Sequence, residues 1–457
     1  MAGLFAILLA VALGCALVLR FANLTSLQPR WASALVIFGS GTALGIGLTS
    51  ILFLVALLLI PGLPSLAMWV EIAVLAWVSY DLYRRRDPAP TRESQNQFPW
   101  NLALMAALAL AMALVIGAMS GAWENNPQGN WDAWAIWNLR ARFLAAGGSV
   151  AHRAWSPRLG FTHPEYPLLT SAFVARAWTY GHTLSAAVPM AVSCLFFLAL
   201  ISLATGGMAA WRSRPLGLLL GLSLAATPTL VHVVPEQYAD VPLACYFTGA
   251  LMLALLERPV LAGLLAGLAA WTKDEGLLFV AVFLAAATIF RRQQFLRLLA
   301  GSALGGGVAI LFKTILARGN ASLLSASLPL LGQHLSDPGR YLQVVVAMGA
   351  EFTSMASGWY HPILPALALA IALRFDVQRR RDVLFCSTVA LLLFGGYFFV
   401  YIITPNDLTW QLQTSLSRLY VQIWPILLLA IWTALRSPET TAIVPVETPK
   451  ARKKAKA

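Results

Sequence analysis

The segment Trp123–Leu169 gathers side chains that could carry out acid–base chemistry. Its carboxylates, arginines, histidines and tryptophans directly follow a long apolar run, and Asp132 lies among them. A positioned carboxylate can act as a general base that removes a proton from an attacking hydroxyl group. Asp132 is therefore the candidate catalytic base, and the alternative is that it only caps the start of a helix.

The residues after Asn130 predict a helix with apolar side chains on two opposite sides. Asp132 and Ile136 fall on one side, whereas Trp134 and Trp137 fall on the other. Tryptophan is enriched where lipid meets water, so the pattern favours an interfacial helix with its tryptophans at headgroup level. In the first turn, the positive end of the helix favours the charged form of Asp132.

Further polar breaks between apolar runs carry the other candidate residues. These are His163, Glu165 and Tyr166, then Asp240, then Lys273 and Glu275, and finally Arg418. Connections between apolar helices are commonly polar, so each break is also explained as a solvated turn. A guanidinium group matches phosphate oxygens, which makes Arg418 a candidate phosphate ligand; the alternative is that it reaches to lipid headgroups.

The sequence predicts neither a disulfide framework nor an obligatory metal centre. The four cysteines are Cys15, Cys194, Cys245 and Cys386. They lie inside apolar runs without a CxxC spacing, as expected for small buried side chains. Asp132, His163 and Glu165 could together ligate a metal, but their spacing matches no recognised pattern. We expect no obligatory cofactor, with a divalent cation as the alternative.

The composition is that of a polytopic membrane protein. Of 457 residues, 59% are hydrophobic and 11% are charged, whereas an ordinary soluble domain carries about 25% charged residues. The net charge of +13 is distributed as short basic clusters between apolar runs. This is the positive-inside pattern of membrane proteins and not a continuous stripe that would bind nucleic acid, so no nucleic-acid partner is expected.

A spanning helix needs about 20 mainly apolar residues, and runs of this kind predict about 13 spans. The expected spans are 3–20, 33–58, 65–83, 99–121, 184–206, 216–234, 238–257, 260–272, 276–290, 295–316, 359–374, 383–404 and 420–436. Two moderately apolar stretches, 166–180 and 341–357, are expected to lie along the membrane as interfacial helices. GxxxG spacings at Gly41/Gly45, Gly117/Gly121, Gly263/Gly267 and Gly301/Gly305 permit close helix packing.

Placing the arginine clusters in the cytoplasm puts every candidate residue on the extracytoplasmic face. The first large loop on that face is 122–183, and Arg418 lies at the outer start of the last span. We expect a three-span N-terminal module at 1–95, a catalytic membrane domain at 96–436, and a disordered basic cytoplasmic tail at 437–457. Membrane lipids surround the protein, and the expected location is the bacterial inner membrane.

In their order and sidedness these motifs resemble those of the polytopic C-type (GT-C fold) glycosyltransferases, which use polyprenyl-phosphate-linked sugars. Relatives there include aminoarabinose transferases and protein O-mannosyltransferases. The resemblance covers about 99–436, and the motifs are Asp132, His163–Leu169, Tyr238–Pro242 and Lys273–Gly276. The chain departs from the pattern in its three additional leading spans, and Glu165 stands where many relatives read Lys-Pro-Pro. It also shows no large soluble C-terminal domain.

The resemblance implies an all-α, GT-C-like helix bundle that takes part in cell-envelope glycan biosynthesis. Its activity would be transfer of a sugar from a polyprenyl-phosphate-linked donor to a hydroxyl group of a lipid, glycan or protein acceptor, with inversion. The implied catalytic residues are Asp132, Glu165 and Asp240. The implied donor-binding residues are Arg140, Lys273, Arg418 and Tyr166, with His163 and Glu275 as further candidates.

Two other functional classes fit the same features. One is a different lipid-linked glycan transferase, such as an O-antigen ligase or polymerase, for which Arg340 and His334 could serve. The other is a transporter or flippase of a lipid-linked solute, which would move its substrate without forming a glycoside. A purely structural subunit gives no reason for carboxylates gathered on one face.

Overall fold

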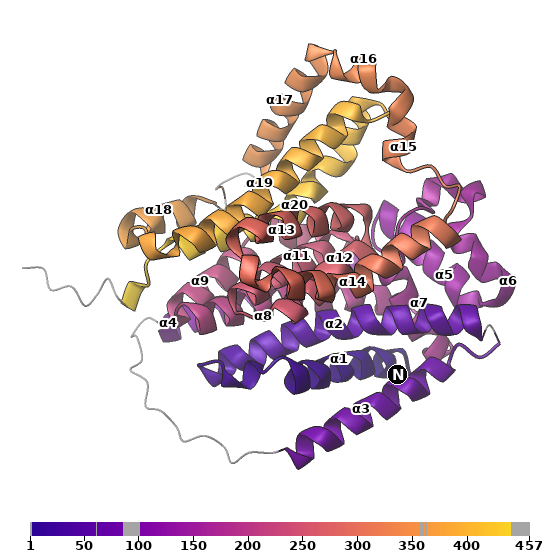
Figure 1. Cartoon of the computed structure of the whole chain (residues 1–457), viewed down its shortest axis with the longest axis horizontal. Coiled ribbons are helices and arrows are strands. Elements are labelled where there is room, and N and C mark those ends of the chain that lie inside the picture. Colours follow the sequence, from indigo (N-terminus) through magenta and orange to yellow (C-terminus); the bar gives the residue numbers. More distant parts are fainter. Residues whose placement is uncertain (1, 61, 86–100, 356–360, 362, 440–457) are drawn as a thin grey trace, which may run out of the picture.

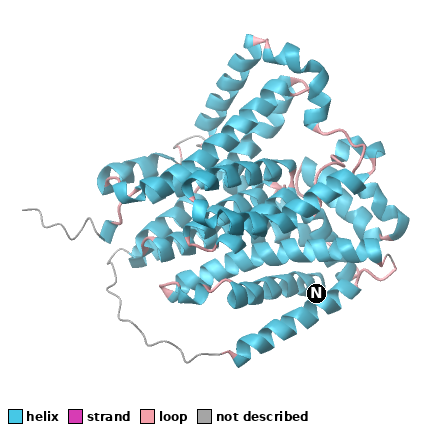
Figure 2. Ribbon diagram, in the orientation of Figure 1, coloured by secondary structure: helices cyan, strands magenta, loops and turns pink. Residues whose placement is uncertain are grey.

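The computed structural model describes residues 2–60, 62–85, 101–355, 361 and 363–439. These residues are helical almost throughout, as Figures 1 and 2 show, and within the described ranges no strand forms. One isolated bridge joins Phe375 and Leu435. The expected all-α class is confirmed.

Eight described helices are long and apolar enough to cross a membrane, as expected for a helical membrane protein. They are α1 (Ala2–Phe21), α2 (Arg30–Leu59), α3 (Leu66–Arg84), α4 (Asn101–Asn125), α8 (Ala187–Trp211), α14 (Phe295–Leu311, with its flanking turns), α19 (Arg380–Ile403) and α20 (Leu408–Ala434). The expected number of about 13 spans stays a prediction.

Shorter helices fill the space between and beside these eight. They are α5 (Asn138–Ala146), α6 (Gly148–Ala151), α7 (Leu169–Gly181), α9 (Arg214–Ala225), α10 (Pro228–Val233), α11 (Asp240–Leu255), α12 (Pro259–Thr272), α13 (Asp274–Phe290), α15 (Leu323–Ser327), α16 (Leu331–Leu335), α17 (Pro338–Ser354) and α18 (Ile363–Leu373). In Figure 1, α15–α17 form an arch that rises beside α19 and α20, away from the remaining helices.

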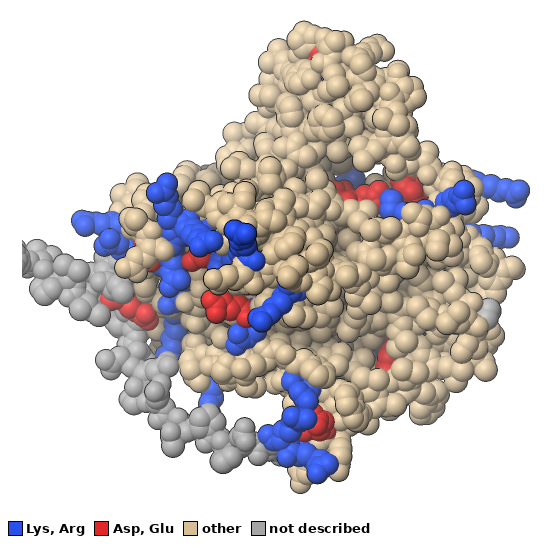
Figure 3. Space-filling model, in the orientation of Figure 1, with Lys and Arg blue, Asp and Glu red and all other residues tan. Residues whose placement is uncertain are grey.

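Basic side chains tie the helix ends together at one end of the bundle, called here the arginine end. Arg212, after α8, pairs with Asp376 and donates to the carbonyl of Leu435 beyond α20. Arg291, after α13, pairs with Asp382 of α19, and Arg20 of α1 pairs with Asp81 of α3. Figure 3 shows blue side chains gathered there, at the left of the view. The polar breaks of interest lie at the opposite end, called the site end.

Glycine permits the closest helix contacts in the bundle. A Cβ on Gly14 of α1 would collide with the backbone of Gly41 and Gly45 on α2. Between α12 and α14, a Cβ on Gly263 or Gly301 would likewise collide with the backbone of the facing helix. The GxxxG pairs Gly41/Gly45, Gly263/Gly267 and Gly301/Gly305 therefore serve as predicted. Around Gly117 and Gly121 of α4, a Cβ would meet nothing within 4 Å.

Two expected spans have different boundaries in the structure. The expected span 216–234 is broken between α9 and α10, because Thr227 is extended and Pro228 starts a new helix. The last helix starts at Leu408, and not near 420, because the side chain of Asp407 accepts a hydrogen bond from the Trp410 amide at 2.7 Å. Arg418 consequently lies inside α20 and not at its start.

The two stretches expected to lie along the membrane differ from one another. Almost every residue of α7 is buried against neighbouring helices, so 166–180 is an internal helix and not a surface one. Its 13 residues span about 20 Å, which is less than the hydrocarbon thickness. By contrast, α17 buries Val344 and Met348 toward α19 and α20 and leaves most of its other residues exposed.

The first three helices share one core with the rest of the chain. α2 packs along α8, and α1 packs against α7, so the described part of 1–95 packs against the remainder of the bundle. Of the expected tail 437–457, residues 440–457 lie outside the described part. The same is true of 356–360 and 362 near the expected span 359–374, of which Ile363–Leu373 forms α18.

A buried ion pair fixes α3 to this core. Nε of Arg176 in α7 donates to Oε1 of Glu71 at 2.7 Å, and its Nη2 pairs with Oε2. The remaining nitrogen donates to the carbonyl of Ala6 in α1 at 2.8 Å, and Tyr180 donates to Glu71 at 3.1 Å. Both charged side chains are fully buried, so each depends on the other for its stability there.

We predict that Glu71→Gln lowers the free energy of unfolding by about 3–5 kcal/mol, because Arg176 is then left buried without its counter-charge. The double variant Glu71→Met/Arg176→Met should lose less than Arg176→Met or Glu71→Gln alone. Reversible unfolding in mixed detergent micelles measures these differences. Equal stability of Glu71→Gln and the wild type would show that the pair does not hold α3 in place.

Candidate functional site

Asp132 and Arg418 form an ion pair at the site end. Nη1 of Arg418, from α20, bonds to Oδ2 of Asp132, and the two side chains are 15% and 16% exposed. The guanidinium also lies 5.0 Å from the centre of the Tyr238 ring. Two residues that are 286 positions apart in the chain thus meet in one mostly buried pair.

The side chain of Asp132 does not cap this helix, which was the alternative to its role as a base. Asn130 starts this helix, because its side chain accepts from the Trp131 amide at 2.8 Å and its carbonyl from the Ala133 amide at 2.9 Å. The Asp132 side chain makes no capping bond. It is therefore free to pair with Arg418.

A π-helical turn at Ala133–Trp137 changes the expected faces of this helix. The additional residue in the turn rotates Trp137 away from the side of Trp134. Trp137 is buried, whereas Trp131 and Trp134 are about half exposed and contact each other edge to face at 4.5 Å. Only these two tryptophans can act as the predicted interface anchors.

A second group of charges lies beside the ion pair, where α11, α12 and α13 meet α20. Nζ of Lys273 lies 2.8 Å from Glu275 and 3.4 Å from Asp240. The amide of Gln422 donates to Asp240 at 2.5 Å, and Tyr397 donates to Gln422 at 2.5 Å. This chain of contacts fixes Asp240 and Lys273 in place.

Lys273 is held in its charged form. Burial by itself lowers the pKa of the Lys273 ammonium, but the carboxylates of Asp240 and Glu275 outweigh this and leave the pKa above its usual value. Lys273 is therefore a fixed positive charge and not a candidate base at neutral pH.

Tyr166 lies between Lys273 and two aromatic residues of the loop 122–183. Its ring stacks on His163 at 4.6 Å and on Trp137 at 6.0 Å, and Nζ of Lys273 lies 5.8 Å from the ring centre. Burial raises the pKa of the Tyr166 hydroxyl. Tyr166 is nevertheless partly exposed, so it orients His163 and Trp137 and still offers some surface to a ligand.

Glu165 lies on the His163 side of this aromatic stack. It contacts Nδ1 of His163 at 3.0 Å, and its backbone carbonyl accepts from Lys313 at 3.1 Å. Lys313 also bonds to both oxygens of Asp274, at 2.7 and 2.9 Å. The Tyr166 ring thus lies between His163 and Lys273, and the contacts of Glu165 and His163 described here do not include the Asp132–Arg418 pair.

Arg140 has a structural role that differs from its predicted one. It is fully buried, and it donates to the carbonyl of Ala154 at 2.8 Å and to that of Tyr166 at 2.6 Å. Burial lowers the pKa of its guanidinium to about 10, which still leaves it charged at neutral pH. A side chain so enclosed is not placed to bind a phosphate, and Arg140 instead holds the loop around Tyr166.

Three polar residues of the candidate site lie outside the motifs that the sequence predicted: Lys313, Gln422 and Tyr397. Lys313, Gln422 and Tyr397 lie within apolar runs that were interpreted only as spans. An ionisable residue inside such a run is itself a signal of function or of a buried partner. That signal could have identified Lys313 from the sequence.

Figure 3 shows where acidic side chains gather at the surface. Red side chains, with some blue ones, line the hollow beneath the largely uncharged arch of α15–α17. Within the described ranges, no group of three or more histidine, cysteine or carboxylate side chains is arranged to hold a metal ion. The expectation that no metal ion is obligatory stays a prediction.

The C-terminal end of α19 is capped by Arg340 and His334, the two residues that an O-antigen ligase or polymerase could use. Arg340 donates to the carbonyls of Ile402, Tyr401 and Thr404, at 2.9 to 3.2 Å. Nδ1 of His334 lies 3.3 Å from the carbonyl of Ile403. These contacts satisfy the open carbonyls at the end of the helix and attach the arch to it.

No family model, no curated protein and no solved structure matches this chain.

We predict that Arg140→Gln lowers the thermal midpoint of unfolding, because two buried carbonyls lose a charged donor. The matched control is Arg142→Gln, since Arg142 is exposed and lies two residues away. Circular dichroism in detergent measures both midpoints. An Arg140 variant as stable as the control would contradict the structural role.

Proposed function

We propose that the protein is a membrane glycosyltransferase that transfers a sugar from a polyprenyl-phosphate-linked donor to an acceptor hydroxyl group on the extracytoplasmic face of the bacterial inner membrane. The observation that carries this proposal is the Asp132–Arg418 pair. In this pair the predicted base, Asp132, contacts the predicted phosphate ligand, Arg418, although the two residues lie near opposite ends of the region 99–436 that carries the resemblance. Asp240, Lys273 and Glu275 lie around it.

The pair suggests how donor binding prepares the base. A guanidinium can bind carboxylate or phosphate oxygens, and it is used for both in proteins. When the donor phosphate takes the place of Asp132 on Arg418, the carboxylate is released toward the acceptor. Lys273, which stays charged, provides a second cation near the phosphate.

The transfer step balances with these groups alone. The acceptor oxygen forms a bond to the anomeric carbon as the bond from that carbon to the phosphate oxygen breaks. The electron pair of the broken bond stays on the phosphate, where Arg418 and Lys273 stabilise the growing negative charge. The hydroxyl proton passes to Asp132, and attack opposite the leaving group inverts the anomeric centre.

The neighbourhood also limits the ways in which a phosphate can bind. Asp132, Asp240 and Glu275 surround the two cations Arg418 and Lys273, so an anion must compete with three carboxylates for them. Binding is favoured only if Asp132 moves away from Arg418 and leaves the guanidinium to the phosphate. Burial raises the pKa of the nearby Glu236 carboxyl, although the Asn130 amide that donates to it acts in the opposite direction.

We predict that Asp132→Asn inserts and folds normally but transfers sugar at least about 100-fold more slowly, the smallest contribution typical of a general base. Glu124→Gln is the matched control, because Glu124 is exposed at the end of α4. Transfer of radiolabelled sugar in nanodiscs measures the rate. Wild-type turnover by Asp132→Asn would exclude this residue as the base.

We predict that Arg418→Gln raises the KM for the lipid-linked donor about 10-fold to 100-fold, because a charge-assisted hydrogen bond contributes about 1.5–3 kcal/mol. Arg418→Lys should recover part of the loss, since it restores the charge without the planar fork. Steady-state kinetics at varied donor concentration separates KM from kcat. If the donor dependence of Arg418→Gln is unchanged, Arg418 does not bind the phosphate.

A further inference from the structure

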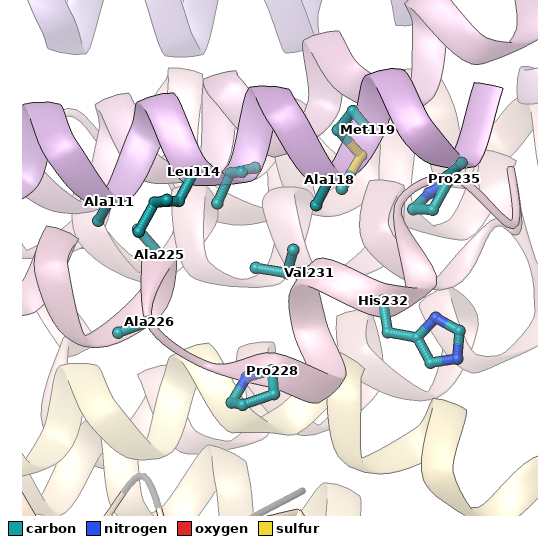
Figure 4. Close-up of a pocket in the computed structure, with 12 residues that line it drawn as sticks. Ala111, Leu114, Ala118, Met119, Ala225, Ala226, Pro228, Val231, His232 and Pro235 are labelled. Carbon is teal, nitrogen blue, oxygen red and sulfur yellow. The ribbon is translucent and has the colours of Figure 1, made fainter. Parts of the chain in front are cut away.

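Two apolar grooves run along α4, which is the least buried of the eight long helices. The first, of about 530 Å³, lies between α4 and the α9–α10 segment, and Figure 4 shows it in close-up. The second, of about 430 Å³, lies between α4 and α8. Both volumes lie in the range of pockets that hold small ligands.

The first groove is formed by small side chains and by the helix break. Ala111 and Ala118 of α4 lie opposite Ala225 and Ala226, next to the break before Pro228. Ala122 also lines the groove. From Ala111 to Ala122 the groove extends about 17 Å along the helix, at a rise of about 1.5 Å per residue. Its lining is apolar apart from His232, whose ring in Figure 4 points away from α4.

One end of this groove leads to the candidate site. Pro235 lines the groove, and the next residue, Glu236, accepts a hydrogen bond from Asn130 at 3.3 Å. Tyr238, two residues further on, lies beneath the guanidinium of Arg418. The segment 235–238 therefore separates the groove from the Asp132–Arg418 pair.

We propose that the groove between α4 and α9–α10 binds the isoprenoid chain of the donor, with the phosphate directed toward Arg418. This inference rests on the proposed function and assigns the lipid part of its substrate to a place in the fold. An apolar, elongated groove suits a single hydrocarbon chain, and a cation beyond its site end suits the attached phosphate. The exposed outer surface of α4 lets a longer chain continue into lipid.

The two grooves differ in the charges at their polar ends. The second groove ends at Trp123 and Glu124, so its polar end carries an exposed carboxylate that repels a phosphate. The first groove ends beside His232 and Pro235. The carboxylate of Glu236, which follows Pro235, accepts a hydrogen bond from Asn130 and lies near Arg418, so its charge is partly compensated. An anionic lipid therefore binds in the first groove in preference to the second.

Groove-filling variants of the full chain in phosphatidylcholine nanodiscs test this assignment with polyprenyl phosphate as the probe. Ala118→Trp fills the groove, whereas Ala113→Trp places the same side chain on an exposed part of α4 that lines neither groove. We expect Ala118→Trp to raise the Kd for polyprenyl phosphate about tenfold, and Ala113→Trp to leave it unchanged. Equal Kd values for the two variants would overturn the assignment.

Two measurements on the wild type keep the test independent of how well Ala118→Trp folds. A polyprenyl phosphate with a diazirine on its chain should label residues 225–232, which line only the first groove, and labelling at 194–198, which line only the second, without 225–232 would overturn the assignment. Phosphatidylglycerol should displace it poorly; displacement as effective as that by unlabelled polyprenyl phosphate would mean a general lipid groove and would also overturn it.

The transfer assay separates this inference from the proposed function. If polyprenyl phosphate binds and labels the groove but its sugar-linked form yields no glycoside, the groove assignment stands and the glycosyltransferase proposal fails. If the wild type forms glycoside while Ala118→Trp and Ala113→Trp share its KM for the donor, the proposal stands and the groove assignment is overturned.

Discussion

The arrangement of the site depends on the cost of holding charge within an apolar bundle. A buried charge is tolerated only when a partner and hydrogen bonds compensate for the water that it has lost. Arg418 on the apolar helix α20 meets this condition through Asp132, and Lys273 meets it through Asp240 and Glu275. The carboxylates thus stabilise these cations within the bundle, and the ion pairs hold the polar breaks together.

In the proposed function, the same constraint couples donor binding to chemistry. Because Asp132 already balances the charge of Arg418, an incoming anion competes with that carboxylate for the guanidinium. The carboxylate that it replaces in our proposal is the one suited to accept a proton. Elsewhere the bundle uses paired charges for a different purpose, since Glu71 and Arg176 are enclosed with all their partners and fix α3 to α1 and α7.

Hydrophobic runs and motif order were enough to predict the all-α class, the long apolar helices and several members of the site. The structure brings together residues that were predicted one by one from polar breaks: Asp132, Asp240, Lys273, Glu275 and Arg418.

What the sequence did not reveal depends on tertiary context. A π-helical turn moved Trp137 to the buried side, the cap at Asp407 extended α20 by more than two turns, and packing on all sides turned 166–180 into an internal helix. The burial of Arg140 was not predicted either, because a sequence does not show that a guanidinium will donate to backbone carbonyls.

The central claim is that a glycosidic bond forms at this site. It is tested most directly by a single turnover of purified protein in nanodiscs with a polyprenyl-phosphate-linked sugar, radiolabelled in the sugar, and a panel of hydroxyl acceptors. The account predicts a labelled glycoside of inverted anomeric configuration, formed together with free polyprenyl phosphate. Recovery of intact donor, moved across the bilayer of proteoliposomes but never cleaved, would contradict it and identify a transporter instead.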